Sequence, residues 1–255
     1  MIAQRTLLSF LLLFPLLNPL FAQRGIVFDS WQEVVVFSFN SNPDIPWVGG
    51  YNSPQFSNLD INLDGIPDLL VFDRIGNRII PLIHQGTVGQ PDFRFAPEYI
   101  SRFPALEAWV LALDYDGDGN ADLFTHHPEE GIKVYRNTSS GADSLSFEVF
   151  NAGNYIPTVR PGSSSDLLKV LDIDIPGIAD LDNDGDLDIL SFDLGGSFIE
   201  YHKNMSVEAY GHSDSLTFVL DEACWGHVQE DGTINAMQLG VFCKGEGVED
   251  ERGGR

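Results

Sequence analysis

Three acidic segments carry the residues of this 255-residue chain that are best suited to chemistry. Residues 60–68 read DINLDGIPD, residues 114–122 read DYDGDGNAD, and residues 180–188 read DLDNDGDLD. All three fit the pattern D-x-[DN]-x-D-G-x-x-D. Carboxylates crowded at alternate positions of a tight turn repel one another, so the pattern favours a cation bound among them. The sequence therefore predicts three metal sites, named here loops one, two and three.

Calcium is the ion that suits these loops. It takes about six to eight oxygen ligands in flexible geometry, whereas Mg²⁺ demands a smaller octahedron, and zinc or copper would prefer the His or Cys that the loops lack. Glycine in the sixth position permits the sharp bend, and the seventh residue can offer its backbone carbonyl. The expected ligands are Asp60, Asn62, Asp64, Ile66 and Asp68 in loop one, Asp114, Asp116, Asp118, Asn120 and Asp122 in loop two, and Asp180, Asp182, Asp184, Asp186 and Asp188 in loop three.

The EF-hand begins with a similar loop and is the main alternative. It requires a bidentate Glu in the twelfth position and a helix on each side. The twelfth residues here are Val71, Thr125 and Ser191, and the flanking segments have the pattern of strands. Dockerin modules are excluded for the same reasons.

The segments around the loops must position these carboxylates, and they repeat as well. A short apolar run precedes each loop, and three strand-like runs follow it: LLVFD, RIIPLI and FRFAPEY after loop one, LFTHH, IKVYRN and LSFEVF after loop two, and ILSFD, SFIEYHKN and LTFVL after loop three. Alternation of apolar and polar residues, as in residues 132–135, favours strands. Repeated units of four antiparallel strands are typical of β-propeller blades. The predicted fold is all-β, an array of four-stranded antiparallel propeller blades with about three to four blades present.

The loops and their strand context resemble the FG-GAP repeats of the integrin α-subunit propeller and the VCBS-type repeats of bacterial exported proteins. The resemblance extends over residues 48–222. It implies that each loop joins the first two strands of a blade and holds Ca²⁺ with the side chains named above. The Phe-Gly and Gly-Ala-Pro signatures of the family are not intact, which favours the bacterial branch.

The number of blades is smaller than a ring requires, because closed propellers have about four to eight. Three units are clear, and residues 26–39 combined with residues 237–242 are the candidates for a fourth. We expect a partial or truncated propeller whose remaining blades belong to a longer chain; a small closed ring and pairing with another copy are the alternatives.

Both ends of the chain have their own expected roles. Residues 1–22 combine Arg5, an apolar stretch over residues 7–17 and the small residue Ala22, as in a secretory signal peptide. The stretch is short for a membrane span of about 20 apolar residues, so we expect cleavage and a secreted or cell-surface protein, periplasmic or on the outer surface in a Gram-negative cell. Repeats then fill residues 23–222. Residues 223–255 form a C-terminal segment with an acidic tail, in which Cys224 and Cys243 can pair as a disulfide hairpin.

Charge narrows the choice of partner. With 38 acidic and 14 basic residues the formal charge is −24, which excludes nucleic acid and anionic membranes as partners because both require clustered Lys and Arg. The predicted function is a calcium-stiffened adhesion or interaction module that binds an extracellular protein or polysaccharide. The aromatic residues Trp47, Tyr51, Trp109 and Tyr155 are candidates either for stacking on sugars or for the core of the blades.

An extracellular lyase or hydrolase acting on polysaccharides is the alternative function. No motif of a metalloprotease, serine hydrolase or P-loop is present, and the obvious acids are engaged by the metal sites. His126-His127, which replaces a Phe-Asp pair found after the other loops, is the remaining candidate for catalysis or metal binding. Asn137 and Asn204 begin acceptor motifs for N-glycosylation.

Overall fold

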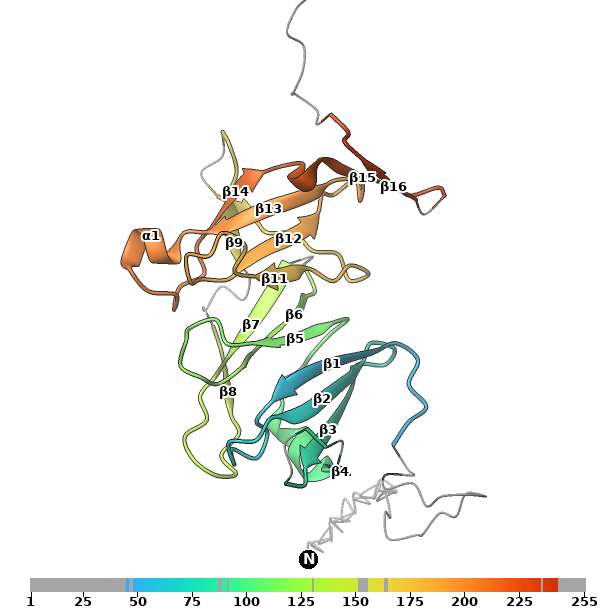
Figure 1. Cartoon of the computed structure of the whole chain (residues 1–255), viewed down its shortest axis with the longest axis vertical. Coiled ribbons are helices and arrows are strands. Elements are labelled where there is room, and N and C mark those ends of the chain that lie inside the picture. Colours follow the sequence, from blue (N-terminus) through green and yellow to red (C-terminus); the bar gives the residue numbers. More distant parts are fainter. Residues whose placement is uncertain are drawn as a thin grey trace, which may run out of the picture. The chain divides into compact units, whose positions relative to one another are not determined.

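The computed structural model describes residues 45, 48–86, 89–90, 92–129, 131–150, 156–162, 165–234 and 236–242. They belong to the compact unit Phe37–Arg255. The unit Met1–Val36, with the expected signal peptide, lies outside the described residues, and so do Trp47, Tyr155, Cys243 and all of segment 26–39. The described part is all-β with short helices (Figure 1), which confirms the predicted fold class.

Three sets of four antiparallel strands have the strand order of propeller blades, in which each strand pairs with the next strand along the chain. The acidic loop connects the first and second strand in every blade, as expected. Blade one contains β1 (Pro54–Leu59), β2 (Asp68–Asp73), β3 (Arg78–His84) and β4 (Phe93–Phe95). Blade two contains β5 (Val110–Leu113), β6 (Asp122–His127), β7 (Gly131–Asn137) and β8 (Phe147–Val149). Blade three contains β11 (Gly177–Ala179), β12 (Asp188–Phe192), β13 (Ile199–Asn204) and β14 (Phe218–Glu222).

Blade three is extended by two strands that the sequence pattern does not predict. β9 (Pro157–Val159) pairs in parallel with β14, and β10 (Asp166–Leu167) pairs antiparallel with β9. The result is a six-stranded sheet in the order β10-β9-β14-β13-β12-β11. The chain between blades two and three thus covers an outer edge that would otherwise expose unpaired backbone groups.

Short helices and a hairpin complete the described part. They are η1 (Pro97–Arg102), α1 (Ser206–Tyr210), η2 (Trp225–His227), β15 (Val228–Asp231) and β16 (Ala236–Leu239). η1 ends the FRFAPEY run after three strand residues, because Pro97 lacks the N–H that a ladder needs and has the φ of a helix start. β16 pairs with β15, whereas the proposed fourth blade would have combined it with residues 26–39. No helix among the described residues is long and apolar enough to cross a membrane.

Two apolar cores lie on opposite faces of blade two, and the alternation of side chains along its strands produces both. Leu123 of β6 packs in a cluster with Leu70 and Phe72 of blade one, while the next residue, Phe124, packs with Ile189 of blade three. Each buried side chain of this size contributes about 1.5–3 kcal/mol. Sheet-on-sheet packing through both faces of a blade is how successive propeller blades adhere.

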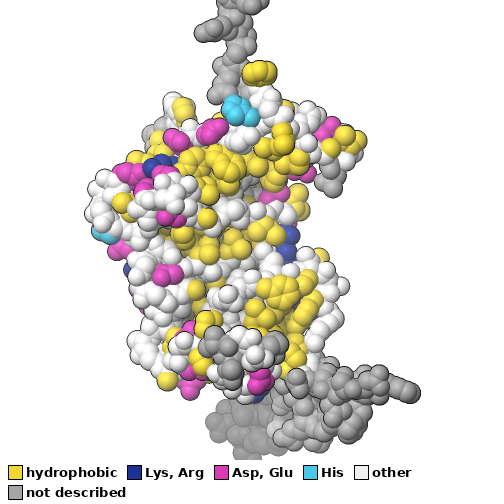
Figure 2. All heavy atoms as spheres, viewed as in Figure 1, with side chains coloured by type: hydrophobic (Ala, Val, Ile, Leu, Met, Phe, Trp, Pro, Cys, Tyr) yellow, Lys and Arg dark blue, Asp and Glu magenta, His cyan; other side chains and the backbone are white. Residues whose placement is uncertain are grey.

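The surface of the described part combines apolar and acidic regions. Figure 2 shows hydrophobic side chains over the β12–β13 face and acidic side chains around α1. Exposed apolar residues also extend along the hairpin, where Leu239 is 79% and Met237 53% exposed. Cys224, which precedes the hairpin, is buried and disulfide-bonded.

Candidate metal centres

The three loops share one backbone conformation. Their fourth residues, Leu63, Gly117 and Asn183, all have φ between 60° and 74°. Their sixth residues are glycines whose φ lies between 85° and 101°: Gly65, Gly119 and Gly185. Two left-handed residues separated by one ordinary residue fold the loop back on itself, so that side chains from alternate positions converge. The common sequence pattern therefore encodes a common backbone turn.

The first carboxylate of each loop orients the backbone of the turn. Both oxygens of Asp60 accept hydrogen bonds, from Asp64 N at 3.1 Å and Gly65 N at 2.8 Å. Asp180 accepts from the equivalent residues of loop three, and Asp114 accepts from Gly117 and Gly119. Carboxylates at the third and fifth positions accept N–H groups two residues further on, as in Asx turns. The loops are thus ordered by their own backbone donors.

The ninth carboxylate, at the start of the second strand, is buried and joins three parts of the blade. Asp68 accepts from Ile61 N at 2.8 Å through one oxygen and from His84 N at 2.7 Å through the other. Asp122 and Asp188 make the same two contacts in their blades. Burial raises the pKa of all three carboxyls against these hydrogen bonds, that of Asp122 to about 7. A neighbouring cation would offset the cost of keeping these buried carboxylates charged.

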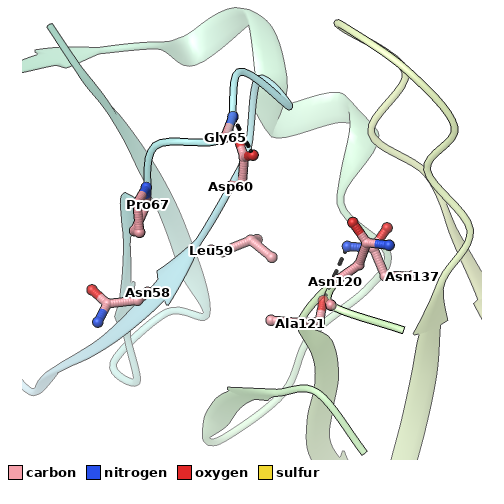
Figure 3. A pocket seen from close by; sticks show the side chains of 9 residues that line it. Asn58, Leu59, Asp60, Gly65, Pro67, Asn120, Ala121 and Asn137 are labelled. Carbon is pink, nitrogen blue, oxygen red and sulfur yellow. Dashed lines mark hydrogen bonds between the residues drawn. The ribbon is translucent and has the colours of Figure 1, made fainter. Parts of the chain in front are cut away.

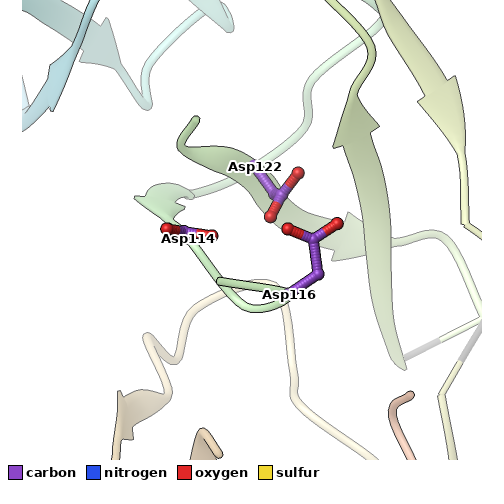
Figure 4. A group of neighbouring side chains, drawn as sticks. All are labelled: Asp114, Asp116 and Asp122. Atoms are coloured by element: carbon purple, nitrogen blue, oxygen red, sulfur yellow. The ribbon is translucent and has the colours of Figure 1, made fainter. Parts of the chain in front are cut away.

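Loop two brings its carboxylates together (Figure 4). One oxygen each from Asp114, Asp116 and Asp122 lies within 4.8 Å of the others, the spacing of ligands around one ion. The Arg136 guanidinium, from the end of β7, contacts Asp116 Oδ2 at 2.5 Å and neutralises part of the cluster. The geometry fits a hard cation with oxygen ligands.

Loop three resembles loop two and contains one more aspartate. Oxygens of Asp180, Asp182 and Asp184 converge within 4.8 Å. The Lys203 ammonium, one residue from the end of β13 like Arg136 in β7, hydrogen-bonds to Asp182 and holds the pKa of that carboxyl below its usual value. A basic side chain from the third strand therefore contacts the third loop position in both blades.

Loop one differs in its third position. Asn62 is neutral there, and its Nδ2 donates to Asp64 Oδ2 at 2.9 Å. The third strand of blade one has Ile83 where the other blades have Arg136 and Lys203. Asp60 and Gly65 also line an open cleft of about 300 Å³ that is shared with Asn120 of loop two (Figure 3). Loops one and two thus face a common hollow.

Two residues that support the loops were not predicted from the sequence. They are Asn137 and Asn204, at the ends of β7 and β13. Each donates its backbone N–H to the ninth carboxylate and its side-chain Nδ2 to the carbonyl of the eighth loop residue, Ala121 or Leu187. The recurring Arg-Asn and Lys-Asn pairs in IKVYRN and SFIEYHKN are the signal that identifies them. Both asparagines are at most 4% exposed, so folding withholds these amides from glycosylation.

The candidates for sugar stacking and catalysis occupy other environments. Trp109 is fully buried in the core between blades two and three, which excludes it from contact with a glycan. His126 is buried in β6. Ser191, His202 and Glu200 form a buried network, but Ser191 Oγ and Glu200 Oε2 both approach the same nitrogen, His202 Nε2, at 3.3 and 3.4 Å. A catalytic triad needs its acid on the opposite nitrogen, so this network holds strands together and activates no nucleophile.

Comparison with known proteins agrees with this geometry. Residues 60–125 match the family described as FG-GAP-like repeat. The matched segment begins at the first residue of loop one and ends in β6, so it includes loops one and two. No curated protein and no solved structure matches the chain. The chain contains an FG-GAP-like repeat, which confirms the predicted resemblance over residues 60–125.

Proposed function

We propose that this chain is an exported calcium-binding repeat protein whose three loops each take up Ca²⁺ and thereby stiffen the blades. The supporting observation is that three segments far apart in the sequence share the same left-handed backbone positions, and that acidic oxygens converge in loops two and three. The ions would be held by the side chains at positions one, three, five and nine and by the carbonyls of Ile66, Asn120 and Asp186. The bound ion supplies positive charge that offsets carboxylate repulsion.

The role of the ion in this proposal is structural. Without the ion, each loop concentrates negative charge beside a buried carboxylate, and the repulsion destabilises the folded blade. With it, the free energy of binding adds to the free energy of folding. Extracellular modules need affinities of only about 10⁻⁴ to 10⁻³ M.

Removal of the metal tests the proposal. We expect the full chain to melt several degrees lower in excess chelator than in millimolar Ca²⁺, as measured by circular dichroism. Asp118→Ala should reduce the number of bound ions by one, because the fifth loop position is a ligand, whereas Asp92→Ala, an exposed acid between β3 and β4, should leave the number unchanged. Identical melting curves with and without the chelator would contradict the proposal.

The stiffened blades are proposed to present a surface to an extracellular protein or polysaccharide. Support comes from the FG-GAP-like repeat, which is typical of interaction modules, and from the open cleft of mixed polar and apolar lining between loops one and two. Capture on immobilised polysaccharides or surface proteins, with and without chelator, measures this binding. Binding that depends on Ca²⁺ supports the module, and binding that is indifferent to Ca²⁺ contradicts the link between loops and surface.

Export is proposed from residues 1–22, with cleavage of this segment after Ala22. N-terminal sequencing of protein recovered from the extracellular fraction of an expressing cell tests it. The expected first residue is Gln23.

A further inference from the structure

We propose that loop three holds a second cation, bound by Asp184, Asp186 and Glu208 beside the ion of the loop itself. The inference extends the proposed calcium binding and adds a fourth ion to the chain. Glu208 lies outside the loop, in α1, and no repeat pattern assigns it a role.

The three carboxylates converge although they come from two different elements. One oxygen of each lies within 4.8 Å of the others. Asp184 and Asp186 belong to the loop, and α1 follows β13, so the chain returns to the loop after a full strand. This convergence distinguishes Glu208 from an acid scattered on the surface.

Asp186 supplies an independent indication of a ligand. The residue is only 1% exposed. Its Oδ2 accepts the backbone N–H of Val207 at 3.0 Å, and this bond fixes the carboxylate in place. Its Oδ1 is buried and has no hydrogen-bond partner among the described residues. A buried carboxylate oxygen without a donor is costly, and a cation coordinated there would remove that cost.

Charge gives the same answer when the three loops are compared. Counting each loop's carboxylates with the charged side chains that contact them, loop one has three acids and no base, and loop two has four acids and Arg136. Both carry a formal −3, which one divalent ion reduces to −1. Loop three has five aspartates and Glu208 against Lys203, a formal −5. Two divalent ions are needed to reach the same −1.

Lys203 neutralises only part of the negative charge at the second site. Its ammonium contacts Glu208 Oε1 at 2.6 Å and lies 3.5 Å from Asp184 Oδ2. The single charge of Lys203 is already included in the balance. The seventh residues of the other loops are Ile66 and Asn120. In the part of the chain that the structure describes, β3 and β7 are each followed by a strand and not by a helix, so the arrangement is found there in blade three alone.

Ion stoichiometry tests the second site. Equilibrium dialysis of the full chain against millimolar Ca²⁺ should give four ions per molecule. Asp186→Asn and Glu208→Gln should each give three. Asp186→Asn keeps the backbone carbonyl that the first ion would use, so loss of more than one ion is not expected. Asp221→Asn, which removes an exposed acid from β14, is the matched control and should retain four.

The outcomes separate this inference from the proposed function. Three ions in the unmodified chain, with two in Asp118→Ala, would overturn the second site and leave the three loop sites intact. Four ions in both Asp186→Asn and Glu208→Gln would overturn the ligand assignment. No bound ion in any variant would overturn both proposals. Circular dichroism of each variant in Ca²⁺ checks that the protein is folded. If one of the two variants does not fold, the other still tests the second site.

Discussion

At the scale of single residues, backbone conformation decides which side chains the loops can present. The glycine in the sixth position of loop two, Gly119, has φ of 91°. A Cβ there would meet no atom within 4 Å. Any cost of a larger residue is therefore conformational and owes nothing to steric contact with neighbours. Glycine is retained for the left-handed turn that directs the carboxylates inward.

Gly119→Ala should lower the free energy of unfolding by about 1 kcal/mol, because an L-residue pays roughly this to enter the left-handed region. Gly232→Ala is the control, since its Cβ also meets open space and its φ is not positive. Urea denaturation of both variants measures the difference. Equal stabilities would contradict the conformational argument.

Glu200 is a second residue whose environment has a measurable consequence. Burial alone would raise the pKa of its carboxyl, but hydrogen bonds from His202 and from the Arg160 fork at 2.7 Å hold that pKa at about 2. The folded value is below the ordinary 4.5. The stabilising contribution is therefore present above pH 4.5 and is lost as the pH falls toward 2.

Glu200→Gln should consequently flatten the dependence of unfolding free energy on pH between 4.5 and 2. Arg160→Met, which removes the guanidinium fork from the carboxylate, should flatten it as well. Denaturation midpoints measured across this range provide the test. If the unfolding free energy of both variants fell between pH 4.5 and 2 as steeply as that of the unmodified chain, the ion pair would not contribute to acid unfolding.

At the scale of elements, the end of the third strand controls the loop beside it. Asn204 at the end of β13 donates to Leu187 O, and its Oδ1 accepts from Ser206 and Thr217. It thereby connects loop three, α1 and the segment that enters β14. The buried side-chain amide of Asn204 thus hydrogen-bonds backbone groups in three segments that lie outside the strand pairings.

Asn204→Ala should destabilise the chain by about 2–3 kcal/mol, because it leaves several buried donors and acceptors unpaired. Asn58→Ala, at an exposed position of β1, should change stability by less than about 0.5 kcal/mol. Thermal unfolding in the presence of Ca²⁺ compares them. A small loss for Asn204→Ala would mean that water replaces the amide.

At the scale of the whole described unit, polar contacts join the blades in addition to the two apolar cores. The Arg74 guanidinium, just after β2, donates to Ala108 O at 2.7 Å before blade two and to Asp172 O and Ile173 O before blade three. One side chain of blade one thus reaches the entrances of both other blades. Gln55 of β1 adds a bond to Val110 N at 2.9 Å.

Arg74→Met should cost about 1.5–3 kcal/mol, the value of hydrogen bonds from a charged group. It should also increase hydrogen exchange at the starts of blades two and three. Arg94→Met removes a surface ion pair with Glu98, with both side chains about half exposed, and should cost less than about 1 kcal/mol. Equal effects of the two substitutions would contradict a joining role for Arg74.

Local patterns in the sequence were sufficient to predict the loops, the four strands of each of the three blades and their grouping into blades. The spacing of Asp and Gly dictates a turn whose conformation depends on its own nine residues. Alternation along segments such as residues 132–135 dictates which side chains share a face. These interactions are local, so residues 60–68, 114–122 and 180–188 could be recognised as equivalent loops.

Contacts between distant segments were decided by the tertiary structure alone. The parallel pairing of β9 with β14, the burial of Trp109 between two blades and the approach of Glu208 to Asp186 depend on where the chain returns after a strand. No periodicity encodes that path, because it follows from how whole sheets pack. The sequence by itself determined three acidic loops of one pattern; the fold determined which further side chains reach them.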